Sequence, residues 1–171
     1  MLFKSTRSTE KASASAAEVI KQGLATDGGL FVPETIPTLT EEEILALCKE
    51  SYPVRAARIL SKFLSDYTYE ELLADCEKAY DETSFVGGAA PLVPIHGPFS
   101  ALELWHGPTA AFKDMALQIL PYLLTTSAKK IRKRLCTMDS ITQAIRHIVM
   151  KEVFSAMLAE TTMLLNRRAT E

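Results

Sequence analysis

One lysine, Lys113, stands in the stretch of the sequence best suited to chemistry on a small molecule. It belongs to the nonapeptide HGPTAAFKD, residues 106–114. Gly107 and Pro108 interrupt the preceding apolar run, so the nonapeptide is typical of a turn that opens a helix, with Thr109 as the expected N-cap. The positive end of a helix dipole disfavours an ammonium group by about 0.3–1 kcal/mol. We therefore expect Lys113 to offer a free amine, the form that attacks aldehydes.

The elements that position this lysine follow from the apolar spacing behind it. One apolar stripe at helical intervals predicts a long helix that packs into a core, formed by Phe112, Met115, Ala116, Ile119, Leu120, Leu123 and Leu124. Phe112 and Trp105 are expected to exclude water from the lysine, which again favours the neutral amine. Asp114 is not expected to pair with Lys113, because adjacent helical residues do not face each other. Pro121 should kink or end the helix near Leu120.

Two long strings resemble the threonine synthase family. The first, LELWHGPTAAFKDMALQ (residues 102–118), is similar to the segment in which that family's HGPTxAFKD lysine binds pyridoxal 5'-phosphate (PLP) as a Schiff base. The resemblance places this role on Lys113, although the family usually has phenylalanine where Trp105 stands. The second, STR followed by GLATDGGLFVPE, resembles the start of threonine synthases. Looser matches occur at SDYTYEEL and APLV.

The resemblance implies an α/β fold that is rich in helices over this chain. Residues 1–83 would form an α+β N-terminal domain, and residues 84–130 would begin a PLP cofactor domain of fold type II, the tryptophan-synthase β-like type. Lys113 would be the catalytic and cofactor-binding residue. The other members of the turn would lie behind it, no closer than a second layer around the cofactor: His106, Thr109, Phe112 and Asp114.

The implied reaction converts O-phospho-L-homoserine and water into L-threonine and phosphate, a step of threonine biosynthesis. Phosphate would leave the γ carbon and water would add at the β carbon. Two alternatives stay open. The chain is also compatible with an inactive fragment that docks to a partner, and with another PLP lyase such as a serine or threonine dehydratase. The paired strings favour threonine synthase over the dehydratases.

Composition narrows the partners and the location. The chain has 171 residues, 23% charged side chains and a net charge of −2, which indicates neither a nucleic acid nor a membrane as partner. Three widely spaced cysteines, Cys48, Cys76 and Cys136, predict reduced thiols in a cytoplasmic protein. Neither His96 nor His106 has companions at ligand spacing, so we predict no metal site. The patterns leave the oligomeric state open.

Local signals predict the remaining elements. Short strands are expected around residues 2–4, 30–32 and 100–105, a loop and strand region over 85–98, and a helix over 13–24. Capping boxes at Thr40 with Glu43 and at Thr68 with Glu71 begin helices that reach about residues 50 and 80, and Pro53 begins another that runs to residue 64. Gly87 and Gly88 could bring amides to an anion, but Pro91 lacks an amide, which argues against a phosphate cradle.

Residues 131–171 do not resemble the family. No glycine occurs after Pro121, and residues 122–171 hold nine Lys and Arg against four Asp and Glu. We interpret the basic run at 129–134 as a solvated helix end, and we expect a helix from about Asp139 to Leu165. These changes favour a truncated, frameshifted or fused product. Such a chain would lack the groups that hold the cofactor phosphate and the substrate, and would have little activity alone.

Overall fold

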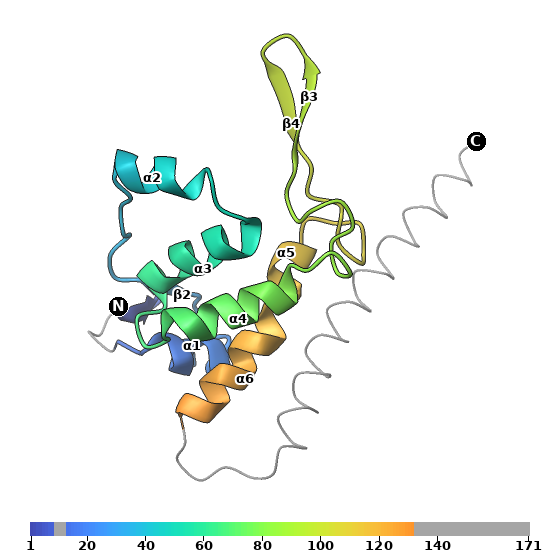
Figure 1. Cartoon of the computed structure of the whole chain (residues 1–171). Coiled ribbons are helices and arrows are strands. Elements are labelled where there is room, and N and C mark those ends of the chain that lie inside the picture. The colour runs from blue at the N-terminus through green and yellow to red at the C-terminus, as the bar shows by residue number, and fades with distance from the viewer. Residues whose placement is uncertain (9–12, 132–171) are drawn as a thin grey trace, which may run out of the picture. The chain divides into compact units, whose positions relative to one another are not determined.

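The structure, a computed structural model, describes residues 1–8 and 13–131, and Met1–Arg132 make one compact unit. The described residues form six helices and four short strands (Figure 1). The helices are α1 (Ala16–Gln22), α2 (Glu41–Leu47), α3 (Tyr52–Phe63), α4 (Tyr69–Ala79), α5 (Asp114–Leu117) and α6 (Leu120–Lys130). The strands are β1 (Phe3–Ser5), β2 (Phe31–Pro33), β3 (Leu92–His96) and β4 (Phe99–Leu102). This helix-rich mixture of helices and small sheets agrees with the α/β class expected from the sequence.

The strands form two separate antiparallel pairs. β1 pairs with β2, with Lys4 opposite Val32, and β3 pairs with β4, with Leu92 opposite Leu102. The second pair is a hairpin that projects from the helices (Figure 1). Every residue of β3 is exposed. Neither pair is a central sheet. The helices supply most of the core, to which β1 adds Phe3.

Capping boxes begin three of the helices. The Thr40 and Thr68 hydroxyls each accept the backbone N–H three residues ahead. The carboxylates of Glu43 and Glu71 accept the backbone N–H of these threonines, as predicted. Ser15 does the same at the start of α1. The α2 helix ends at Leu47, before the expected residue 50, because the amides of Lys49 and Glu50 bond to carbonyls only three residues back.

Helices α1, α3, α4 and α6 enclose the core. Its fully buried centre includes Ala57, Leu72 and Cys76. Leu123 of α6 and Ile119, the residue directly before α6, also belong to the core. The second half of the predicted apolar stripe therefore packs as expected. Burial raises the pKa of the Cys76 thiol to about 12, and both Cys48 and Cys76 are free thiols, as predicted.

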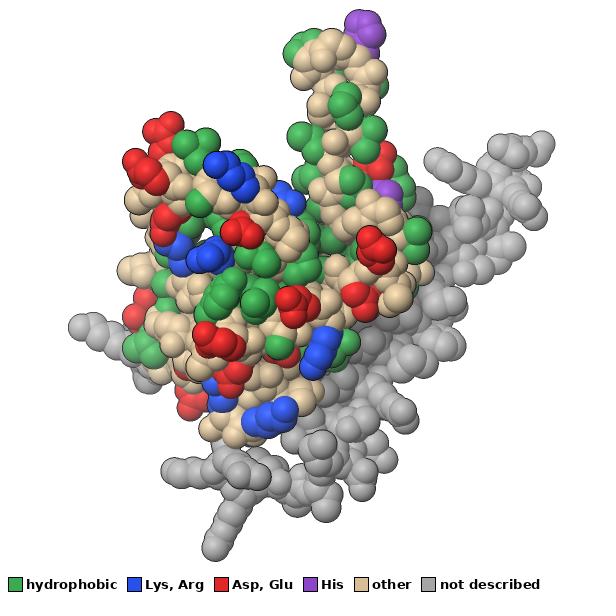
Figure 2. All heavy atoms as spheres, viewed as in Figure 1, with side chains coloured by type: hydrophobic (Ala, Val, Ile, Leu, Met, Phe, Trp, Pro, Cys, Tyr) green, Lys and Arg blue, Asp and Glu red, His purple; other side chains and the backbone are tan. Residues whose placement is uncertain are grey.

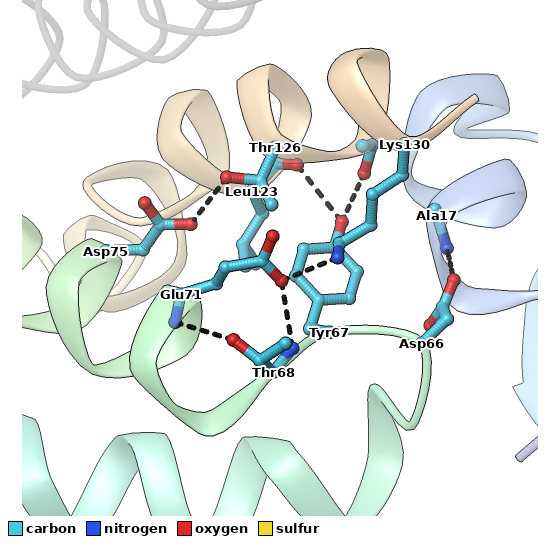
Figure 3. Close-up of polar contacts among 10 residues, drawn as sticks. Ala17, Asp66, Tyr67, Thr68, Glu71, Asp75, Leu123, Thr126 and Lys130 are labelled. Carbon is cyan, nitrogen blue, oxygen red and sulfur yellow. Dashed lines mark hydrogen bonds and ion pairs between the residues drawn. The ribbon is translucent and has the colours of Figure 1, made fainter. Parts of the chain in front are cut away.

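Polar side chains join α6 to the segment that leads into α4 (Figure 3). The Tyr67 hydroxyl donates to the Leu123 carbonyl at 3.1 Å and is bonded to the Ser127 hydroxyl. Because a carbonyl can only accept, the Ser127 hydroxyl must be the donor to Tyr67. Thr126 donates to the Asp75 carboxylate at 3.0 Å. Burial raises the pKa of Tyr67 to about 12, so this hydroxyl keeps its proton at physiological pH.

An ion pair closes the exposed end of the same interface. Lys130 lies 2.5 Å from the Glu71 carboxylate, which also belongs to the capping box of α4. This contact with Lys130 lowers the pKa of Glu71. The contribution of Glu71 to stability is therefore present above its unfolded pKa and is lost as the pH falls through the folded value.

The predicted single helix behind the lysine is wrong in its first half. α5 begins only at Asp114 and ends at Leu117, and α6 begins at Leu120. The break spans residues 118 and 119, close to Leu120 as the sequence predicted, and Pro121 is the second residue of α6. Phe112 does not join the buried stripe, because its side chain is 73% exposed.

Two sequence predictions lie outside the described residues. They are the helix from Asp139 to Leu165 and the basic run beyond Lys130; Cys136 also falls there. Among the helices of the described part, none is long and apolar enough to span a membrane.

The interface between Tyr67 and α6 yields a stability prediction. Tyr67→Phe removes two buried hydrogen bonds and leaves the Ser127 hydroxyl without its partner, so we expect a loss of about 1–3 kcal/mol in the free energy of unfolding. Urea unfolding followed by circular dichroism measures it. Tyr69→Phe is the control: that ring lies under Arg58 at 5.3 Å and keeps this contact, so its effect should stay within about 0.5 kcal/mol. Equal losses in the two variants would contradict the interpretation.

Candidate functional site

The buried carboxylate of Asp114 holds the turn that precedes α5. Asp114 is fully buried; its Oδ2 accepts the Thr109 N–H and its Oδ1 accepts the Thr109 hydroxyl, both at 2.8 Å. The predicted N-cap role of Thr109 is therefore wrong. Its hydroxyl is already given to a side chain five residues ahead, and the helix begins at that side chain.

Close approach of Asp114 requires a residue without a side chain at position 107. A Cβ on Gly107 would lie 2.5 Å from the Asp114 Cβ and 2.6 Å from its Oδ2, closer than real Cβ atoms come to any neighbour. Ala110, in the middle of the turn, has a φ of 52°. A non-glycine residue in this left-handed region stores strain of about 1–2 kcal/mol. The turn is thus tight, strained and held by its own carboxylate.

His106 joins the start of the turn to two other segments. Its Nδ1 lies 2.8 Å from the Val86 carbonyl and its Nε2 lies 2.7 Å from the Glu103 carboxylate. The bond with Glu103, and then that with Val86, raises the pKa of His106. Gly87 has a φ of 84°, and a Cβ there would lie 3.3 Å from Nδ1. Gly87 therefore gives the imidazole room to approach, which is a structural reason for glycine at this position.

Lys113 itself is half-buried and directly precedes α5. Within the described residues its amine has no hydrogen-bond or ion-pair partner. Asp114 faces Thr109, which agrees with the expectation that it does not pair with Lys113. The expectation that Phe112 and Trp105 enclose the amine is wrong, because these side chains are exposed to 73% and 52%.

The arrangement gathers three of the five residues that the sequence singled out into one fixed turn. His106, Thr109 and Asp114 are each held by hydrogen bonds, Lys113 is left free, and Phe112 takes no part in the anchoring. Sequence reasoning missed Glu103 and Val86, and it considered Gly87 only as part of a phosphate cradle. The Glu103–His106 spacing of three residues was visible, but the contact with Val86 spans twenty residues and left no local signal.

Other features of the described part lie away from the lysine. Two surface hollows, of about 470 Å³ beside α2 and α3 and about 380 Å³ beside α1, do not include Lys113 in their lining. In the ranges 1–8 and 13–131, no three His, Cys, Asp or Glu side chains are grouped as metal ligands.

Comparison with known proteins points to one family. Residues 2–80 match the family described as threonine synthase N terminus. Threonine synthase from Pseudomonas aeruginosa is 40% identical over 126 residues, which cover 72% of this chain and 26% of that protein.

Solved structures agree with this match. The structure of PLP-bound threonine synthase from Brucella melitensis has a TM-score of 0.69 and 33% identity, covering 78% of this chain and 29% of that one. Yeast threonine synthase has a TM-score of 0.68 and 34% identity, covering 75% of this chain and 26% of that one. This chain thus spans about a quarter of the length of the relatives that it matches. Over the matched residues, the chain is similar to the N-terminal portion of threonine synthases.

Proposed function

We propose that this chain supplies the cofactor lysine, Lys113, of a PLP-dependent threonine synthase. The complete fold would convert O-phospho-L-homoserine and water into L-threonine and phosphate. One observation carries the proposal: in the HGPTAAFKD turn every polar side chain beside Lys113 is engaged, whereas the Lys113 amine has no partner among the residues that the structure describes. The similarity to threonine synthases supports this reaction rather than dehydration of serine or threonine.

The turn fits PLP because it leaves the Lys113 amine without a carboxylate partner among the described residues. Reaction with an aldehyde needs an amine that no carboxylate holds, and the two nearest carboxylates in the sequence, Asp114 and Glu103, bond to Thr109 and His106 instead. When bound, PLP supplies an electron sink for carbanions on the substrate. Lys113 Nζ would hold the cofactor covalently and, as a free amine, would accept and return protons at substrate carbons.

The domain assignment follows from which part of the threonine synthase relatives the chain matches. We assign residues 1–83 to the N-terminal domain and residues 84–130 to the start of the cofactor domain. The groups that hold the cofactor phosphate and the substrate are expected from the three quarters of the relatives that this chain does not match. We therefore propose that the 171-residue chain binds PLP weakly and forms little threonine by itself.

A specific observation favours a second role, docking to a partner. Figure 2 shows hydrophobic side chains along the β3–β4 hairpin. Leu92 and Leu102, which lie opposite each other, are exposed to 66% and 57%, and Ile95 and Phe99 to 69% and 68%. Exposed apolar clusters of this kind mark interaction sites. The occupant that we propose is the unmatched portion of a threonine synthase chain, because the relatives continue well beyond the matched quarter.

The cofactor role predicts selective chemistry at one lysine. After incubation of the chain with PLP and reduction with borohydride, we expect peptide mass spectrometry to find the label on Lys113, and Lys113→Ala to lose it. Lys62 is the internal control, because its amine is held 2.7 Å from the Glu43 carboxylate and should react less. Labelling of Lys62 equal to that of Lys113 would contradict the proposal.

The anchor of the turn predicts a loss of both stability and labelling. Asp114→Asn keeps one acceptor oxygen and adds an NH₂ group, which faces a Thr109 donor, so we expect a cost of about 1–3 kcal/mol in unfolding free energy. The yield of label at Lys113 should fall with it. Glu77→Gln, at an exposed position of α4, is the control and should change neither quantity. Normal labelling in a measurably destabilised Asp114→Asn chain would show that the anchor does not position the lysine.

The docking role is testable by titration calorimetry. The chain is mixed with Pseudomonas aeruginosa threonine synthase that lacks its matched N-terminal segment, and we expect binding that Phe99→Ser weakens at least tenfold. Ile36→Ser is the matched control, since Ile36 is 79% exposed but lies outside the hairpin. Equal binding by the two variants would contradict the assignment. So would association of the chain with itself through the hairpin, because the occupant would then be a second copy.

A further inference from the structure

The His106 imidazole bridges the segment after β4 and the turn at residues 85–88. Glu103 follows β4, and its carboxylate lies 2.7 Å from His106 Nε2. Val86 belongs to the turn at residues 85–88, and its carbonyl oxygen lies 2.8 Å from His106 Nδ1. The His106 and Glu103 side chains are each only 19% exposed. Gly87, with its positive φ, allows the backbone to come this close to the ring.

The two partners fix the charge of the ring. The Val86 carbonyl can only accept, so Nδ1 must carry a proton to bond with it. The ionised Glu103 carboxylate also only accepts, so Nε2 must carry a proton as well. Both bonds exist together only in the imidazolium form, and the charged group that faces the ring is Glu103.

We propose that Glu103 is a positioning residue which, through the charged ring of His106, fastens the lysine turn to the 85–88 turn. This bridge fixes the entry to the turn, as Asp114 fixes its exit, and leaves Lys113 as the unfastened side chain between them. The proposal rests on the proposed function only for the role of Lys113. The bridge itself is a property of this chain with or without a cofactor.

The bridge gives the turn a defined pH dependence. The pKa of His106 is raised by Glu103 and by the Val86 carbonyl. A group whose folded pKa is raised contributes stability that is fully present below the unfolded value, about 6.5, and is lost as the pH rises through the folded value. The turn should therefore loosen on the alkaline side of the His106 titration while the helical core remains intact.

The chain contains its own reporter for this titration. Trp105 is the single tryptophan of the sequence, and its ring stacks on the His106 ring with centroids 5.6 Å apart and planes 15° apart. A charged imidazole quenches a stacked indole, so we expect emission to rise as the pH increases through the His106 pKa. Glu103→Gln keeps the shape of the side chain but removes its charge, and it should move this midpoint to lower pH.

A second readout follows the turn itself. Amide hydrogen exchange over residues 107–113, corrected for its intrinsic dependence on pH, should accelerate across the same midpoint, and at lower pH in Glu103→Gln. Gly87→Ala should accelerate it at every pH, because a Cβ would crowd Nδ1. Glu77→Gln, an exposed substitution on α4, is the control and should match the unaltered chain. Far-UV circular dichroism establishes that each variant is folded.

Two results that do not involve PLP would overturn the proposal. One is an unchanged pH midpoint of the His106 titration in a folded Glu103→Gln chain. The other is amide hydrogen exchange over residues 107–113 that does not change across this midpoint. Neither depends on PLP, so the two proposals fail separately. If the bridge titrates as expected but Lys113 takes no label, the positioning stands and the cofactor role falls. If Lys113 is labelled equally in Glu103→Gln and in the unaltered chain, Glu103 does not position it.

Discussion

The buried carboxylate of Asp114 is the constraint on which the lysine turn depends. A carboxylate that is fully removed from water needs donors, and here Thr109 supplies two from one residue. That choice excludes any side chain at Gly107 and places α5 four residues later than a Thr109 cap would. Because the Asp114 carboxylate bonds to Thr109, it does not pair with the neighbouring Lys113 amine. The freedom of the lysine amine is therefore a consequence of how its neighbour is buried.

The helices that support this turn were predictable because their signals act within four residues. A capping box is complete in the sequence at Thr68 and Glu71, and the proline at 121 removes an amide wherever the chain lies. Both features were observed where the sequence placed them. The buried half of the apolar stripe followed for the same reason, since Ile119 and Leu123 recur at helical spacing on the side that meets the core.

The anchoring of the turn was not predictable, because it depends on contacts that cross the chain. The sequence favoured Thr109 as a cap, since threonine before a helix usually has an amide as its nearest partner. A buried carboxylate is a stronger acceptor for its hydroxyl, and only the folded turn brings Asp114 within reach. The carbonyl of Val86 is invisible in the side-chain pattern altogether. Phe112 was misplaced because helical spacing was applied to residues that precede the helix.

The helical core and the lysine turn are stabilised by different kinds of contact. α6 is secured by apolar packing and by the contacts of Tyr67 and Thr126, so the chain beyond the lysine is held to the helical core independently of the turn. The turn itself has little apolar support, since Trp105 and Phe112 are mostly exposed. Its shape therefore depends on directed polar contacts, each of which contributes only about 0.5–1.5 kcal/mol of net stability. The lysine is thus positioned by the polar contacts of its own turn rather than by apolar packing.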